Sequence, residues 1–178
     1  FADARDRAFA PERDGARLGQ EQEGLRWQPR PGFVDGKVHN WNGANSAFYL
    51  HRTLRAATAC EVTLSLGSDD AIAAWCNGKE VLRKNVAHGA QLDQERVVIA
   101  LQPGDNDLLL KVTNGGGPGG FAFELWGPSE SAHRAELRRL EQELEQNQGP
   151  LVPILRELPV DKRRVTRVHI RGSFLDQG

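Results

Sequence analysis

The sequence lacks the residues and spacings that mark several familiar classes of protein. It has no methionine and only two cysteines, Cys60 and Cys76. Two cysteines are too few for a disulfide-stapled fold, and neither sits in a spacing typical of zinc or covalent haem. The absence of methionine, with Phe1 as the first residue, predicts a chain that was processed or excised from a longer protein.

Charge of one sign and long apolar runs are also missing. The 23 basic and 24 acidic residues give a formal net charge of -1, so we do not expect nucleic acid as a partner. Apolar runs such as those at 97–100 and 108–110 are far shorter than the roughly 20 residues of a membrane span. No Gly-x-Ser-x-Gly motif and no paired histidine spacing is present. We therefore expect no membrane span and no catalysis by this chain alone.

From residue 46 onward, the sequence consists of short β-rich runs separated by turn signals about ten residues apart. This spacing predicts an antiparallel β-sandwich over 46–127. Asn77-Gly78 indicates a tight hairpin, because both residues tolerate the positive φ angles of a type I′ turn. The predicted strands are 47–54, 60–67, 71–76, 79–83, 95–101, 107–113 and 120–126.

The segments that flank the sandwich differ from it in composition. Residues 1–45 are polar with isolated apolar anchors, which predicts an irregular N-terminal arm that wraps the sandwich. Residues 128–149 carry leucines at helical spacing (Leu137, Leu140 and Leu144), which predicts one amphipathic helix packed on the sandwich or on a neighbouring domain. We expect 150–178 to be an extended tail leading into a downstream domain that this sequence does not contain.

The two cysteines lie on neighbouring predicted strands. If 60–67 and 71–76 pair as an antiparallel ladder, Cys60 and Cys76 both point inward and lie close to each other. A disulfide between them is then geometrically possible. The alternative is two small buried thiols that act as apolar side chains.

Four stretches carry a resemblance to a known family: "NSAFYLHRTLRA", "VTLSLGSDDAIAAWCNGKEVL", "DLLLKVTNGGGPGGFAFEL" and "RELPVDKRRVTRVHIRGSFLDQG". The chain resembles, over 1–178, the middle region of large exported planctomycete proteins that carry cytochrome-c-like domains beside domains of unknown function. The resemblance implies a periplasmic or extracellular location and neighbouring redox or catalytic domains as partners.

The β-rich part is also similar to the galactose-binding-type jelly roll and to the protective-antigen-type sandwich. Their hallmark is a Ser-Asp-Asp-Gly corner followed by an aliphatic strand, and here Ala71 replaces the glycine. This similarity implies a jelly-roll β-sandwich. Some relatives of this sandwich hold calcium with an Asp-Asp pair that in turn binds sugar hydroxyls.

The acidic corner has two interpretations. Asp69 and Asp70 are candidate calcium ligands, because calcium prefers several oxygen atoms, and Asn114 is a candidate contributor from a loop expected at the same end. Aspartates also stabilise turns by accepting hydrogen bonds from nearby backbone amides. The sequence leaves both interpretations open.

Trp41 is the most ligand-like of the four tryptophans, because it lies in the polar, Gly-bearing stretch "HNWNGANS" that we expect to be a loop. With Asn77 and Asn114 it makes up the predicted ligand-binding set; the alternative for Trp41 is an anchor that holds its loop on the sandwich. We expect a non-catalytic recognition or docking module, with polysaccharide as the favoured ligand and calcium as a candidate cofactor. The alternatives are a structural scaffold for neighbouring domains, or a piece of an enzyme whose active site is shared with another chain.

Overall fold

The computed structural model describes residues 2–147 and residue 162. The chain divides into two units, Phe1–Arg139 and Leu140–Gly178. All the β-strands of the described residues belong to the first unit. The predicted tail, 150–178, and the predicted helix end at Gly149 lie outside the described residues, apart from Lys162.

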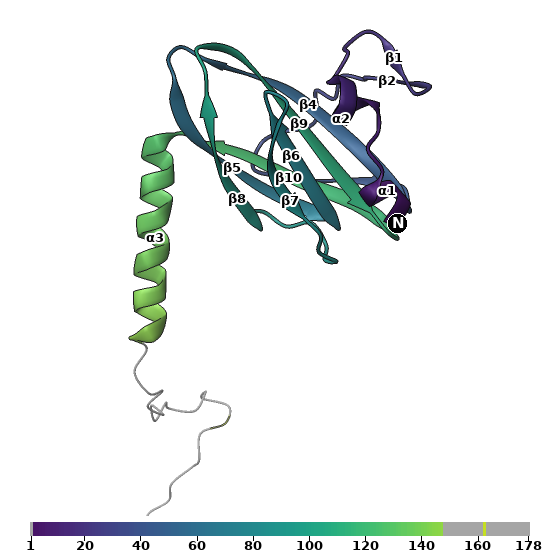
Figure 1. Ribbon diagram of the computed structural model, residues 1–178. Coiled ribbons are helices and arrows are strands. Elements are labelled where there is room, and N and C mark those ends of the chain that lie inside the picture. The colour runs from purple at the N-terminus through teal and green to yellow at the C-terminus, as the bar shows by residue number, and fades with distance from the viewer. Residues whose placement is uncertain (1, 148–161, 163–178) are drawn as a thin grey trace, which may run out of the picture. The chain divides into compact units, whose positions relative to one another are not determined.

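Two four-stranded antiparallel sheets make up the body of the first unit (Figure 1). The first has the order β3 (Val38–Asn42), β10 (Pro118–Trp126), β5 (Cys60–Asp69), β8 (Glu95–Leu101). The second has the order β4 (Ser46–Ala56), β9 (Gly104–Asn114), β6 (Ala71–Cys76), β7 (Lys79–Lys84). The prediction of a mainly β, antiparallel sandwich is confirmed.

The core lies between the sheets and follows the alternation of the strands. On β5, Val62, Leu64 and Leu66 are buried in the core, whereas Glu61 is exposed. The fully buried side chains of Leu108 and Val112 face them from β9 across the sandwich. Fully burying one such side chain stabilises the fold by roughly 1.5–3 kcal/mol, so this alternation is enough to fix which face of each strand points inward.

The β6–β7 hairpin forms as its sequence predicts. Asn77 and Gly78 have φ angles of 50° and 77°, and they join the only two consecutive strands of the two large sheets that pair with each other. Every other pair of strands from β3 to β10 that follow each other in the sequence is divided between the two sheets. The chain therefore crosses from one sheet to the other at nearly every turn.

The expected pairing of 60–67 with 71–76 is wrong. Strand β5 pairs with β10 and β8, whereas β6 pairs with β9 and β7, because the chain crosses between the sheets at Asp70 rather than folding back. The ladder that would have brought Cys60 and Cys76 together therefore does not exist. Both cysteines are free, and both pack on the core between the sheets.

The segment around Trp41 is also not a loop. Residues Val38–Asn42 form the edge strand β3, in which Trp41 pairs with Gly119 of β10. The N-terminal arm therefore ends before Val38, and the sandwich begins eight residues before the expected start at residue 46.

The rest of the arm contains only short elements. These are α1 (Ala2–Asp6), α2 (Ala10–Asp14), β1 (Glu21–Gln22) and β2 (Leu25–Arg26), and the last two form a small separate hairpin. Figure 1 shows the arm beside strand β4. Ala16 and Trp27 of the arm pack on Leu109 and Trp75, which lie on the outer face of the second sheet.

Helix α3 spans Pro128–Gln146 and follows β10 directly. Near its start, the Ser131 hydroxyl donates a hydrogen bond to Thr63 Oγ1 at 3.0 Å, and the Arg134 guanidinium lies 4.4 Å from the centre of the Trp126 ring. The leucine stripe, which we define as Leu137, Leu140 and Leu144, is exposed. No helix in the described part of the chain is both long and apolar enough to cross a bilayer.

Candidate functional site

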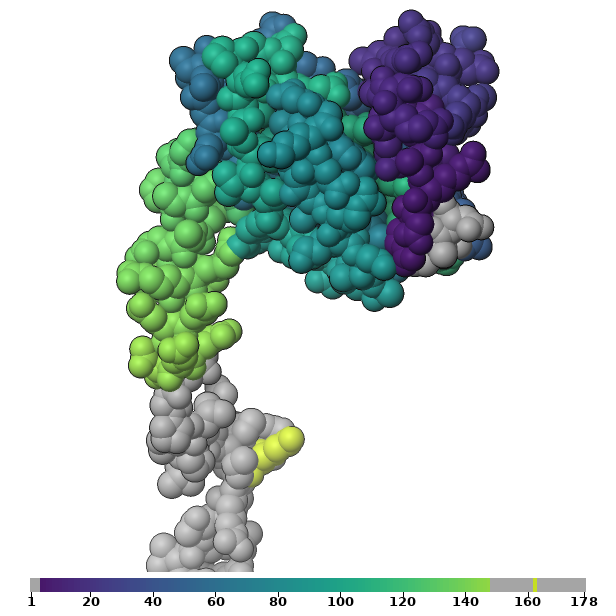
Figure 2. Space-filling model, in the orientation of Figure 1, coloured from purple at the N-terminus to yellow at the C-terminus, as the bar shows by residue number. Residues whose placement is uncertain are grey.

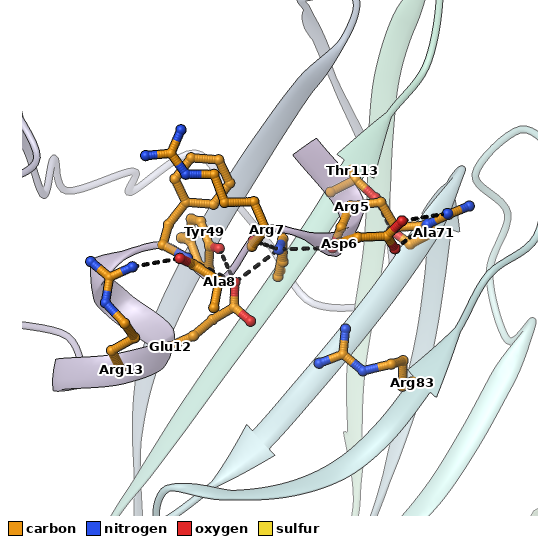
Figure 3. A network of polar contacts seen from close by, with 12 residues as sticks. Arg5, Asp6, Arg7, Ala8, Glu12, Arg13, Tyr49, Ala71, Arg83 and Thr113 are labelled. Carbon is orange, nitrogen blue, oxygen red and sulfur yellow. Dashed lines mark hydrogen bonds and ion pairs between the residues drawn. The ribbon is translucent and has the colours of Figure 1, made fainter. Parts of the chain in front are cut away.

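A buried lysine fixes the start of the arm. The side chain of Lys111, in the middle of β9, is 2% exposed, and its ammonium group donates to the Glu12 carboxylate at 2.8 Å. It also donates to the carbonyl oxygens of Arg5 at 3.0 Å and Arg7 at 2.7 Å. These three acceptors match the three donors of an ammonium group. We call Lys111, Glu12 and the two carbonyls the lysine anchor (Figure 3).

Tyr49 on β4 joins this network. Its hydroxyl donates a short hydrogen bond to Glu12, and the Glu12 carboxylate also accepts from the Phe9 amide at 3.3 Å. Burial, and then the hydrogen bond to Glu12, raise the pKa of Tyr49 well above its ordinary value. Tyr49 therefore stays protonated and acts as a donor to the anchor at any physiological pH.

A second set of contacts fixes the other end of the arm. The Asp35 carboxylate accepts two hydrogen bonds from Arg52 of β4, at 2.6 and 2.8 Å. The amide of Gly36 donates to the carbonyl of Phe123 at 2.9 Å. The Arg52 guanidinium also lies 5.1 Å from the centre of the Phe123 ring. The arm is thus held on the sandwich at both of its ends.

Between its two ends the arm contacts the sheet through Ala16 and Trp27. The Trp27 ring meets the His51 ring edge-on at 5.9 Å, and the indole N–H donates to Gln22 Oε1 at 2.8 Å. The hairpin beside it leaves Leu18 and Leu25 exposed. This part of the arm stands as a wall along the open side of the sandwich.

A groove of about 1140 Å³ lies between this wall and the sandwich. We call it the arm groove; in Figure 2 the arm, in purple, forms a ridge of its own beside the strands. The groove opens along β3 and β4, because each is an edge strand of its sheet. Strand β3 has 5 residues, whereas β4 has 11. The shorter strand leaves core side chains within reach of the groove, among them Leu108, Leu110, Phe121 and Phe123.

Aromatic rings line one end of the arm groove. The Phe33 ring lies 4.9 Å from the His39 ring and 5.0 Å from the Phe121 ring, and His39 lies 5.4 Å from Phe121. Phe33 is 39% exposed, so part of its ring surface is open to a ligand. His39 is held in place by Val34, whose backbone lies 2.9 Å from His39 Nε2. We call Phe33, His39 and Phe121 the aromatic floor; Phe33 is its exposed ring, and the other two rings pack beneath it.

Asp70, one of the two acids of the corner, is engaged in hydrogen bonds with nearby residues. Asp70 Oδ2 accepts a hydrogen bond from the Gly115 amide at 2.8 Å, and the Ser68 hydroxyl donates to the Asp70 carbonyl at 2.8 Å. Burial, and then the neighbouring Asp70 charge, raise the pKa of Asp69. Residues 2–147 contain no group of three or more His, Cys, Asp or Glu side chains placed to hold a metal ion.

Asn114 lies next to this corner, as expected, but its side chain is committed to the β9–β10 loop. It is fully buried, and its amide N–H groups donate to the carbonyls of Gly43 at 2.6 Å and Gly117 at 2.9 Å. Its amide oxygen accepts from the Gly116 N–H at 3.1 Å. Asp70 and Asn114 together therefore hold the β3–β4 turn and the β9–β10 turn in place.

The three residues of the predicted ligand-binding set do not meet. The side-chain oxygen of Asn77 accepts from the Asp107 amide at 2.8 Å, which places Asn77 at the start of β9, whereas Asn114 ends that strand. Seven residues separate Asp107 from Asn114, and an extended strand spans about 23 Å over that length. Asn77 and Asn114 therefore lie at opposite ends of the sandwich.

Trp41 lies at the Asn114 end but packs inward. Its ring lies 4.3 Å from the Phe48 ring and 6.1 Å from the Phe121 ring. Its indole nitrogen is buried and has no hydrogen-bond partner within the described part of the chain. A Cβ on Gly119 would come within 2.7 Å of the indole ring, so the pairing of β3 with β10 depends on a glycine there. Trp41 supports the aromatic floor from behind.

The residues of the arm groove were not identified from the sequence as a site. The available signal was weak: Trp27 and Phe33 are isolated aromatic residues in a polar segment, and such residues indicate only that the segment packs on something. His39 and Phe121 are 82 residues apart in the sequence and are brought together by the pairing of β3 with β10. Comparison with known proteins finds no matching protein family, no similar curated protein and no similar solved structure. The functional interpretation therefore depends on the geometry of the arm groove.

Proposed function

We propose that this chain is a non-catalytic recognition module of a larger exported protein and that it binds carbohydrate in the arm groove. The observation that carries the proposal is the aromatic floor, whose partly exposed Phe33 ring lies in a groove of about 1140 Å³. Sugar rings stack their apolar faces on aromatic rings while neighbouring polar groups bind the hydroxyls. Gln28 and Asn45, both exposed, supply amide groups along the same groove.

We propose in addition that the sandwich is a jelly roll. The strand orders β3-β10-β5-β8 and β4-β9-β6-β7 are those expected of an eight-stranded jelly roll made of two Greek keys. This order supports the resemblance to galactose-binding-type sandwiches. We propose the export of the protein and its planctomycete affiliation from the resemblance to the exported planctomycete proteins. We expect sugar binding to be independent of calcium, because Asp70 and Asn114 are engaged with the backbone of neighbouring glycines.

The proposal is tested by calorimetric titration of the chain with a panel of polysaccharides, with and without a calcium chelator. Phe33→Ala removes the open ring of the floor and is expected to lower the affinity about fivefold to thirtyfold, because stacking on one ring contributes about 1–2 kcal/mol. Val98→Ala is the matched control, since Val98 is an exposed apolar residue on β8, the far edge of the first sheet. Thermal unfolding of both variants separates loss of binding from loss of fold. The proposal fails if no polysaccharide binds or if Phe33→Ala binds like the unchanged protein.

A second function is favoured by helix α3, namely the positioning of neighbouring domains of the parent protein. The leucine stripe is exposed, and no residue of α3 is buried in this chain. An exposed apolar stripe on a helix is typical of a surface that another domain covers. In that case the amides of α3 should exchange hydrogen more slowly in the parent protein than in this chain, and no polysaccharide should bind. Equal exchange in the two proteins would argue against the scaffold.

A further inference from the structure

The arm groove has more positive than negative charge. Its lining includes three arginines, Arg26, Arg30 and Arg52, but only two carboxylates, Glu23 and Asp35. This is the opposite sign from the whole chain, whose formal net charge is -1. Positive charge in a concave site raises the local concentration of anionic ligands.

Neither carboxylate of the groove is available to neutralise a further cation. Glu23 pairs with Arg13 at 2.6 Å, and Asp35 pairs with Arg52 at 2.6 Å. Arg26 has a long contact of 3.6 Å with the exposed Glu21, a geometry that contributes little. Arg30 is the one arginine of the groove lining that makes no ion pair with residues 2–147.

Arg30 is displayed on a stiff turn. It lies between Pro29 and Pro31, whose rings fix their φ angles, and its carbonyl accepts a hydrogen bond from the Phe33 amide at 3.0 Å. Arg30 lines the arm groove and also a second cavity of about 350 Å³, and Phe33 and His39 line both as well. Arg30, which makes no ion pair within residues 2–147, therefore lines the same groove as the aromatic floor, and its side chain is open to a ligand there.

We propose that the ligand of the arm groove is an acidic polysaccharide whose sugar rings carry carboxylates, with Arg30 binding a carboxylate while the ring stacks on Phe33. This inference rests on the proposed carbohydrate function and specifies its substrate class. A planar guanidinium binds a carboxylate through two parallel hydrogen bonds, which makes arginine well suited to uronate rings. A neutral sugar would stack on the same floor but would leave Arg30 without a partner.

The test uses two ligands with the same backbone, polygalacturonate and its fully methyl-esterified form, titrated into the chain by calorimetry at low and at physiological salt. Arg30→Gln removes the charge but keeps a polar side chain. Arg17→Gln is the matched control, because Arg17 is an exposed arm arginine outside the groove lining. Dextran sulfate is included to distinguish sulfate esters from carboxylates as the anion.

We expect polygalacturonate to bind at least roughly tenfold more tightly than its methyl ester, and Arg30→Gln to lose about that factor for the acid alone. Arg17→Gln should stay within about twofold of the unchanged protein, and added salt should weaken only the binding of the acid. Equal binding of acid and ester, unaffected by Arg30→Gln, would overturn the inference but leave the carbohydrate function standing. Tighter binding of dextran sulfate with the same dependence on Arg30 would overturn the carboxylate assignment, and an equal loss in Arg17→Gln would overturn the role of Arg30. If neither acidic nor neutral polysaccharides bind, the proposed function itself is wrong.

Discussion

The replacement Lys111→Met tests whether the lysine anchor holds the arm on the sandwich. Methionine has a similar length and an unbranched apolar stem, so it fills nearly the same space beside Tyr49 without an ammonium group. The change removes the hydrogen bond to Glu12 at 2.8 Å and those to the carbonyls of Arg5 and Arg7 at 3.0 and 2.7 Å. It leaves a carboxylate that is only 10% exposed without its counter-ion.

The expected cost follows from these contacts. Breaking a buried ion pair by removing one partner costs about 3–5 kcal/mol, although release of the arm lets Glu12 return to water and limits the loss. We therefore expect the free energy of unfolding in urea to fall by about 3 kcal/mol, together with faster hydrogen exchange at residues 2–14. The double variant Lys111→Met/Glu12→Gln should be less destabilised than Lys111→Met alone, because it no longer buries an unpaired charge.

Lys79→Met serves as the control, since Lys79 is an exposed lysine on β7 of the same sheet. It should change the free energy of unfolding by no more than about 0.5 kcal/mol. The reasoning is refuted if Lys111→Met also stays within that range and residues 2–14 keep their protection, because the anchor would then contribute nothing to holding the arm.

Four further predictions concern the two aspartates of the corner, the support of the aromatic floor and the thiols. Asp69→Asn is expected to stabilise the protein at pH 7, because burial, and then the Asp70 charge, raise the pKa of Asp69 and disfavour its ionised form in the folded state. This gain should disappear as the pH falls below the ordinary carboxyl pKa of 3.8, where the group is protonated in both states; equal unfolding free energies at pH 7 would contradict it. Asp70→Ala should instead cost about 1 kcal/mol at pH 7, because the Gly115 amide loses its acceptor. Gly119→Ala should lower the free energy of unfolding by about 1–3 kcal/mol, since its Cβ would lie 2.7 Å from an indole ring, and an unchanged urea midpoint would show that the ring can move. A thiol reagent added to the unfolded, unreduced protein should react with both Cys60 and Cys76. The absence of a reaction would mean that the two cysteines form a disulfide.

The strands and the hairpin were predictable because their signals are local. The alternation of Val62, Leu64 and Leu66 assigns one face of β5 to the core whatever its partner strand is. Asn77-Gly78 specifies a tight turn through its own backbone preferences, and the structure has positive φ angles at both residues. Each of the seven expected strands is present, with ends that differ by a few residues.

The pairing of those strands was not predictable from local signals. A short corner such as Asp69-Asp70 can fold a strand back on itself or carry the chain to the opposite sheet, and the choice depends on which strands compete for its edge. Strand β5 pairs with β10, which lies more than 50 residues later, so the expected hairpin and the geometry for a disulfide were both wrong. Trp41 was assigned to a loop for the same reason, since β3 exists as a strand only because β10 provides its partner.

The sequence alone therefore determined that the chain is mainly β, where its strands lie and which faces are apolar, because these properties depend on residues a few positions apart. The tertiary structure decided where a ligand can bind. The arm groove exists because Glu12 and Lys111, 99 residues apart, meet in a buried ion pair that fixes the arm beside the edge strands. The aromatic floor likewise needs Phe33 of the arm, His39 of β3 and Phe121 of β10 to converge. Contacts over such separations leave no periodic pattern in the sequence, because they depend on how complete elements pack against one another.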